Sequence, residues 1–172
     1  IGYSADARTG GAGEINDVSI SEHVFWMMLD PSSGQVLEVK NVSLPSTGEG
    51  HSLAFNSSGE LYVGGTLSVG ASGSLADYFI AKFGVNGVQG PFVTSNSPVD
   101  VYGQDIAVDQ NDDVYLTGYT NGQFDGNPYF GSTDIVLSKY GADLSTVWTS
   151  QFGSDADDFG VDLEVGFEGD IY

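Results

Sequence analysis

The chain has 172 residues and a net charge of −20, since 24 acidic residues are balanced by only four Lys and Arg residues. So large a negative charge argues against nucleic acid and anionic membrane surfaces as partners, because both are bound through Lys and Arg. The absence of Cys excludes disulfides and thiolate metal sites, and no apolar run approaches the length of a membrane span, so membrane insertion is not expected.

The acidic composition leaves three interpretations open: solubility at high ionic strength, calcium binding by some Asp side chains, and an acidic patch for a cationic partner. Apolar residues make up 40% of the chain, which is the composition of a folded domain, and 25 Gly residues suit many tight turns between short strands. Because the chain starts at Ile1 rather than Met, we expect an internal start.

The expected elements are short strands grouped in repeats of four. Residues 1–43 form a weak partial repeat, residues 50–95 and 103–153 form complete ones, and residues 159–172 begin another and stop within its second strand. In the clearest repeat, alternation of apolar and polar residues predicts a half-buried strand over 104–109. A turn follows at 109–113, and further strands are expected at 114–120, 135–140 and 146–152.

The repeat is visible in two motifs that recur in the same order. Tyr62, Tyr115 and Tyr172 fall in register within the first motif, and the second reads DYFIAKFG at 77–84 and DIVLSKYG at 134–141. A four-stranded antiparallel unit of about 40 to 55 residues is the size of a propeller blade, and stacked blades bury their faces against each other. We therefore expect the recurring large aromatic residues to form the core between blades: Phe83, Phe92, Tyr140 and Trp148.

The predicted fold class is all-β, a single partial β-propeller over residues 1–172 with about three four-stranded antiparallel blades. A closed ring usually needs four to eight blades, so the chain is expected to form an open arc rather than a ring. An incomplete sequence is the preferred explanation, with the remaining blades of the full-length chain as partners, and a ring built from several copies is the alternative.

Residues 103–153 resemble the bacterial seven-bladed β-propeller repeat, SBBP. Four motifs stand in the family's order: DIAVD at 105–109, VYLTGYT at 114–120, DIVLSKY at 134–140 and VWTSQFG at 147–153. The resemblance is looser over 50–95, where Asn56 replaces Asp109, and weak over 1–43. It implies a bacterial protein that is secreted or held at the cell surface, and it implies a scaffold rather than a catalyst.

Two sets of residues are candidate metal ligands, with calcium as the only cofactor that the sequence indicates. Asp105 and Asp162 occupy the same place in successive repeats, near the predicted central axis, where they would line an acidic channel that binds a cation. The alternative is that they accept hydrogen bonds from turn or neighbouring-blade N–H groups. Asp109, Asn111 and Asp113 have the alternating spacing of a calcium loop, although a hairpin turn also explains them.

Further acidic residues have simpler expected roles. Asp77 and Asp134 recur before the third strand and are expected to cap loop N–H groups. Calcium binding by the acidic loop at 155–158 is an alternative to a solvated loop.

The function favoured is a non-enzymatic extracellular module that acts as a binding or adhesion scaffold for a protein or glycan. Phe124, Tyr129 and Phe130, in the long loop 121–133, are predicted to be exposed contact residues. Two alternatives stay open: a fragment of a propeller-based polysaccharide hydrolase or lyase, and a structural spacer in a large surface protein. No His-Glu-x-x-His or Gly-x-Ser-x-Gly motif is present in the sequence, so catalytic residues are not expected.

Overall fold

The computed structural model describes residues 2–3, 13–15, 18–20, 24–69 and 75–172. All regular elements in these ranges are β-strands. They are β1 (Gly2–Tyr3), β2 (Gly13–Ile15), β3 (Val18–Ile20), β4 (Val24–Leu29), β5 (Val36–Asn41), β6 (Gly48–Phe55), β7 (Leu61–Val69), β8 (Leu75–Phe83), β9 (Gln89–Thr94), β10 (Val101–Val108), β11 (Val114–Thr120), β12 (Asp134–Tyr140) and β13 (Thr146–Phe152). The described part of the chain holds no helix that could cross a membrane.

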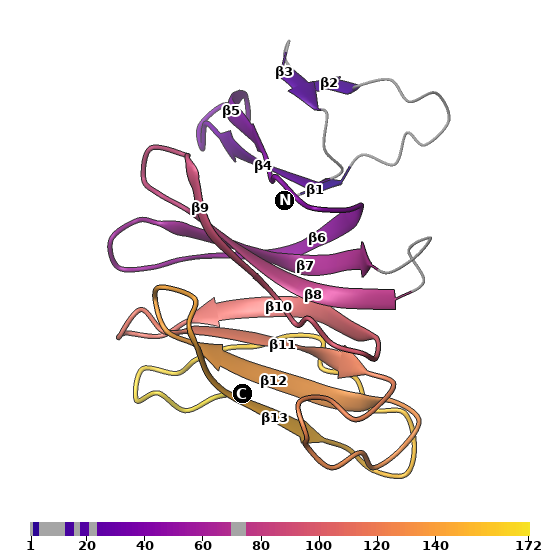
Figure 1. Cartoon of the computed structure of the whole chain (residues 1–172). Helices are drawn as coiled ribbons and strands as arrows, with labels where there is room; N and C mark the ends of the chain where they lie inside the picture. The colour runs from indigo at the N-terminus through magenta and orange to yellow at the C-terminus, as the bar shows by residue number, and fades with distance from the viewer. Residues whose placement is uncertain (1, 4–12, 16–17, 21–23, 70–74) are drawn as a thin grey trace.

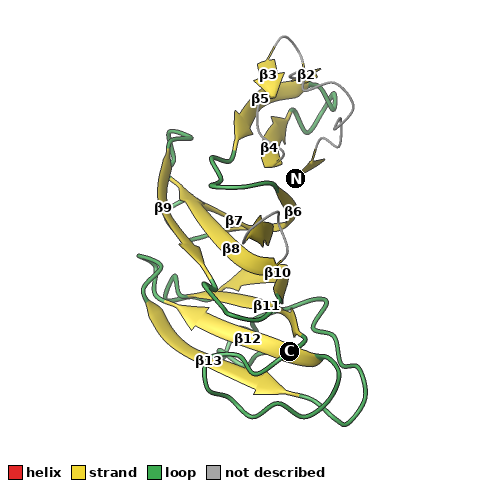
Figure 2. Cartoon of the chain, turned by 45° about the vertical axis from the view of Figure 1, so that its right-hand side comes forward, coloured by secondary structure: helices red, strands yellow, loops and turns green. Residues whose placement is uncertain are grey.

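The strands pair with their sequence neighbours in antiparallel meanders. Strands β6-β7-β8-β9 form one four-stranded sheet and β10-β11-β12-β13 another, here called the second and third blades. The first blade is the three-stranded sheet β1-β4-β5, and β2 pairs only with β3. Figure 1 shows the blades stacked one beneath the next, and the turned view in Figure 2 places the edge strands β9 and β13 along the same side of the stack.

Burial along the strands reflects this stacking. The middle strands β7, β8 and β11 are buried at almost every position. Neighbouring blades cover both faces of β7 and β8, whereas the second blade and the segment after β13 cover β11. Strand β6 alternates between half-buried and exposed residues, and β12 alternates between buried and half-buried ones. A regular alternation in burial is therefore found mainly in strands that have one less covered face.

Two apolar clusters join the blades. One unites the first and second blades and contains Val24, Trp26, Leu61, Val63, Phe79 and Phe83 among its buried members. The other unites the second and third blades and contains Tyr62, Tyr78, Ile80, Ile106, Leu116, Val136 and Tyr140. Phe83 and Tyr140 thus lie in the core between blades as predicted, whereas Phe92 and Trp148, on the edge strands, are only partly buried.

A matching irregularity occurs in the innermost strand of each four-stranded blade. The register of β6 against β7 shifts between Gly50 and Ser52, and that of β10 against β11 shifts between Gly103 and Asp105. Gly118 pairs with Gly103 at this bulge, and a Cβ on Gly118 would collide with the Tyr102 carbonyl oxygen. Glycine is needed here because the bulged backbone passes too close for any side chain.

The predicted fold class is confirmed. The sheets of the described residues stack as an open arc, and none of them closes on itself. After β13 the chain passes back to the inner side of the third blade, where residues 159–172 make a short antiparallel pair through the bridge between Val165 and Ile171.

Candidate functional site

A cleft of about 410 Å³ opens between the second and third blades. Its aromatic lining comes from Tyr78 on β8, Tyr140 on β12 and Phe124 in the loop after β11. Hydroxyl and amide groups supply most of the rest, from the linker after β9 and from β13: Thr94, Ser95, Asn96, Ser97, Thr146 and Thr149. The cleft therefore joins apolar rings to groups that both donate and accept hydrogen bonds.

A buried hydroxyl network fixes the aromatic lining of the cleft. The Tyr78 and Tyr140 hydroxyl oxygens lie 2.6 Å apart, and Tyr78 also bonds the Ser138 hydroxyl at 3.2 Å. Burial raises the pKa of both Tyr78 and Tyr140, so each stays neutral and can donate a hydrogen bond at physiological pH. This network is a preorganised polar patch shared by two blades.

The prediction that Phe124 is an exposed contact residue is wrong. Phe124 is only 4% exposed and packs edge-on against Tyr78 with ring centroids 5.9 Å apart. Its N–H group donates to the Gln151 side chain at 2.9 Å, which draws the loop back over the third blade. Tyr129 and Phe130 are 40% and 50% exposed, and the Tyr129 hydroxyl donates to the Ser132 carbonyl oxygen at 2.7 Å.

Of the cleft residues, the sequence indicates only Phe124, as a contact residue, and Tyr140, as a core residue. Tyr78 and Tyr140 stand at different positions of the second motif, and nothing in one repeat indicates that their hydroxyls meet across two blades. The Ser and Thr residues of the lining are common in the chain and carry no motif.

A second cavity, of about 340 Å³, lies where the innermost segments of three successive repeats meet. Asp105 and Asp162 both line it, together with Glu164. Asp105 accepts a hydrogen bond from the Ser52 hydroxyl of the second blade and another, at 2.8 Å, from the Leu163 N–H group. The structure thus gives Asp105 the alternative role stated for it, that of an acceptor linking adjacent repeats.

A cation in this acidic cavity stays a prediction. Among the described residues, no three or more His, Cys, Asp or Glu side chains are grouped so that they could hold a metal ion.

Residues 94–125 match the family model described as SBBP, a beta-propeller repeat. The resemblance stated from the sequence is thereby confirmed, and the matched SBBP segment includes the linker that borders the cleft, strands β10 and β11, and the start of the long loop. No curated protein matches the chain.

The predicted calcium loop is a hairpin turn of the SBBP repeat. One Asp109 oxygen accepts from the N–H groups of Asn111 and Asp113, at 2.8 and 3.0 Å. The Lys139 ammonium lies 2.7 Å from the Asp113 carboxylate and 3.7 Å from that of Asp109. Calcium binding at these three residues stays a prediction, and the ion would have to compete with Lys139 for two of its ligands.

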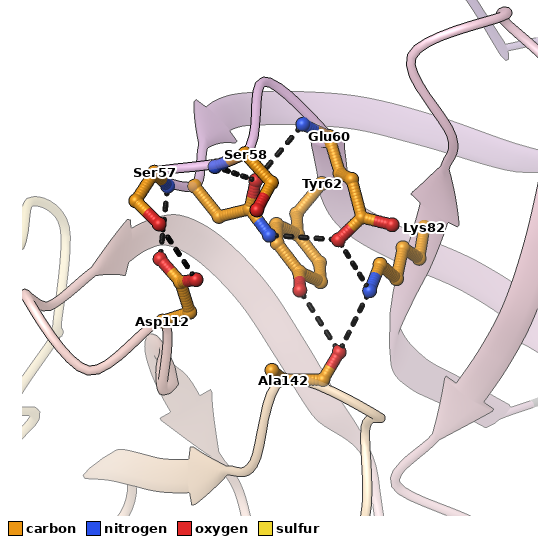
Figure 3. Close-up of polar contacts among 8 residues, drawn as sticks. Ser57, Ser58, Glu60, Tyr62, Lys82, Asp112 and Ala142 are labelled. Atoms are coloured by element: carbon orange, nitrogen blue, oxygen red, sulfur yellow. Dashed lines mark hydrogen bonds and ion pairs between the residues drawn. The ribbon is translucent and has the colours of Figure 1, made fainter.

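The second blade repeats this polar cluster and extends it to its neighbour, as Figure 3 shows. Lys82 pairs with Glu60 at 2.7 Å, and the Asn56 amide donates to the same carboxylate. The Lys82 ammonium and the Tyr62 hydroxyl then both donate to the Ala142 carbonyl oxygen of the third blade, at 3.0 and 2.9 Å. The cluster therefore holds two blades together, which is a structural role.

Carboxylates in three turns of the chain make its stability sensitive to acid. Hydrogen bonds from Ser32, Ser145 and Ser154 lower the pKa of Asp30, Asp143 and Asp158, respectively. A carboxylate whose pKa is lower in the folded state stabilises the fold above its unfolded pKa of about 4, and this contribution is lost as pH falls through the folded value.

We therefore expect the melting temperature to stay constant between about pH 7 and pH 5 and to decrease when the pH is below about 4. Thermal melts in about 0.5 M NaCl, which screens the general repulsion between the acidic residues, provide the measurement. A melting temperature that rises steadily to about pH 3 would show that relief of charge repulsion outweighs the turn hydrogen bonds.

Proposed function

We propose that the chain is a non-enzymatic binding module of an extracellular or cell-surface protein, and that a glycan occupies the cleft between the second and third blades. The observation that carries the proposal is the lining of hydroxyl and amide groups, held over the buried rings of Tyr78, Tyr140 and Phe124. Sugars present many hydroxyl groups that donate and accept hydrogen bonds, so a site of this composition suits them better than it suits a charged ligand.

The charge and size of the cleft support the same class of ligand. Among the described residues, Asp125 is the one charged side chain of the lining, so a polyanion would find no cationic partner there. The volume of about 410 Å³ lies within the range of sites for small molecules or for a short stretch of a longer chain. Strands of two blades supply Tyr78, Tyr140, Thr146 and Thr149, and the linker after β9 and the loop after β11 supply most of the remaining lining.

Two adjacent residues of β13 give a matched pair of test variants. Thr146 lines the cleft, whereas Val147, which is 55% exposed, is absent from its lining. Thr146→Trp is expected to fill the cleft, whereas Val147→Trp adds the same ring outside the lining.

The test is an array of neutral oligosaccharides probed with the whole chain and with each variant. We expect at least one oligosaccharide to bind, with a loss of about 10-fold or more in affinity for Thr146→Trp and little change for Val147→Trp. Equal binding by both variants would show that the oligosaccharide does not bind in the cleft. An array without any ligand would favour a spacer, and release of reducing ends from a bound oligosaccharide would indicate a hydrolase.

A further inference from the structure

Asp134 carries a buried carboxylate that is only half satisfied. It is fully buried at the start of β12, and its Oδ2 atom accepts from the Phe130 N–H group at 2.8 Å and the Gln151 amide at 2.7 Å. The other oxygen, Oδ1, is buried and has no hydrogen-bond partner among the described residues. A buried carboxylate oxygen without a donor or a cation is strongly disfavoured.

The equivalent residue of the second blade, Asp77, shows how this position is normally satisfied. Its Oδ1 atom accepts from the Ser95 hydroxyl at 2.6 Å and from the Ser97 N–H group at 3.1 Å. In the third blade the residue at the place of Ser95 is Phe152, which has no hydroxyl. The N–H group at the place of Ser97 belongs to Ser154.

That N–H group is directed to a different acceptor. The Ser154 N–H and hydroxyl groups both donate to Asp158 Oδ2, at 2.6 and 2.8 Å. Asp158 takes the place that the fully buried Val101 has one repeat earlier. The third blade therefore has a second carboxylate beside that of Asp134, which lacks the donors found in the second blade.

The two carboxylates converge on one point. A Cβ placed on Gly153 would meet Asp134 Oδ1 and, at 3.2 Å, Asp158 Oδ2. None of the ion pairs formed by the described residues involves either carboxylate.

We propose that Asp134 and Asp158 bind a divalent cation, with Ca²⁺ as the ion that fits best. Ca²⁺ takes oxygen ligands in irregular geometry, whereas Mg²⁺ demands a near-ideal octahedron that loops rarely supply.

The position of the site gives the ion a structural consequence. Residue 133 bridges to residue 157 in parallel fashion, and the Asp158 N–H group donates to the Thr133 carbonyl oxygen at 2.8 Å. A cation between Asp134 and Asp158 would therefore tie the start of β12 to the segment that leads into the next repeat. It would act as a clamp between repeats.

The test measures Ca²⁺ binding by the whole chain, using calorimetric titration and thermal melting in about 0.15 M NaCl, where weak binding to the acidic surface is screened. For the wild type we expect one saturable site and a rise in melting temperature of about 5 to 10 °C at 100 times the dissociation constant. Mg²⁺ at the same concentration should have much less effect.

Two variants remove ligands without removing packing. Asp158→Val installs the residue found at the equivalent place one repeat earlier, and Asp134→Asn turns the orphan oxygen into a donor toward Asp158. Both should abolish the calcium-dependent rise in melting temperature. Asp155→Asn, an exposed residue of the same loop, is the control and should keep the response.

Either of two results would overturn the proposal. One is a wild type without a saturable calcium response. The other is a calcium response of Asp158→Val equal to that of the wild type.

Discussion

Replacing Gly118 with Ala is expected to lower the free energy of unfolding by about 3 kcal/mol or more, because the new methyl group has no free space. The atoms nearest to its position all belong to the backbone of β10: the Tyr102 carbonyl oxygen, the Tyr102 carbonyl carbon at 2.9 Å and the Gly103 Cα at 3.2 Å. No side-chain rotation can relieve this contact, so the innermost strand itself would have to move away from β11.

The measurement is chemical denaturation followed by circular dichroism, with Gly90→Ala as the control. Gly90 also lies in a strand, but the nearest atom to its added Cβ is the Lys82 carbonyl oxygen at 3.8 Å, an ordinary contact distance. We expect Gly90→Ala to change the free energy of unfolding by about 0.5 kcal/mol or less. Similar denaturation midpoints for the two variants would contradict the tight passage of β10 past Gly118.

Asp105→Ala is expected to lower the free energy of unfolding by about 2 kcal/mol and to loosen the segment that follows the third blade. The substitution leaves two donors unpaired, the Ser52 hydroxyl and the Leu163 N–H group, each contributed by a different neighbouring repeat. Because Leu163 is 6% exposed and is held partly through this bond, its amide should exchange with solvent about 10-fold faster or more in the variant.

Hydrogen exchange resolved to the Leu163 amide tests this role against a general loss of stability. Asp105→Asn keeps one carbonyl-type acceptor and should fall between the wild type and Asp105→Ala. Asp162→Asn is the matched control, since Asp162 lines the same cavity and is exposed. Faster exchange throughout the third blade, without a larger effect at Leu163, would argue against a specific link through Asp105.

The repeats and their strands could be predicted from the sequence because they are local. The motif that begins at Asp134 repeats the one at Asp77, and both encode the third strand of a sheet. The turn at Asp109 was also readable, since its Asp and Asn residues bond their own backbone within a few positions.

Contacts between blades could not be predicted in the same way. Tyr62 reaches Ala142 across 80 positions and Tyr78 reaches Tyr140 across 62, so neither partner is marked within one repeat. Phe124 was placed at the surface because its loop is long and rich in polar residues, whereas in the structure Gln151 and Tyr78 hold it in the core. The pairing of Asp134 with Asp158 depends in turn on which donors the neighbouring positions lack.

The central claim is that the second and third blades pack face to face, and a disulfide between them tests it most directly. A Cβ on Gly64 of β7 would lie 3.7 Å from the Ile106 Cβ of β10, a separation that suits a disulfide. The chain has no Cys of its own, so Gly64→Cys combined with Ile106→Cys introduces the only two thiols.

We expect the folded double variant to form this bond under mild oxidation, as a monomer that loses two hydrogens by mass and reacts with no thiol reagent after unfolding. Each single variant should keep a free thiol. Two thiols that stay reduced in the folded double variant, or that link only between molecules, would contradict the packing of β10 against β7 on which the propeller arrangement rests.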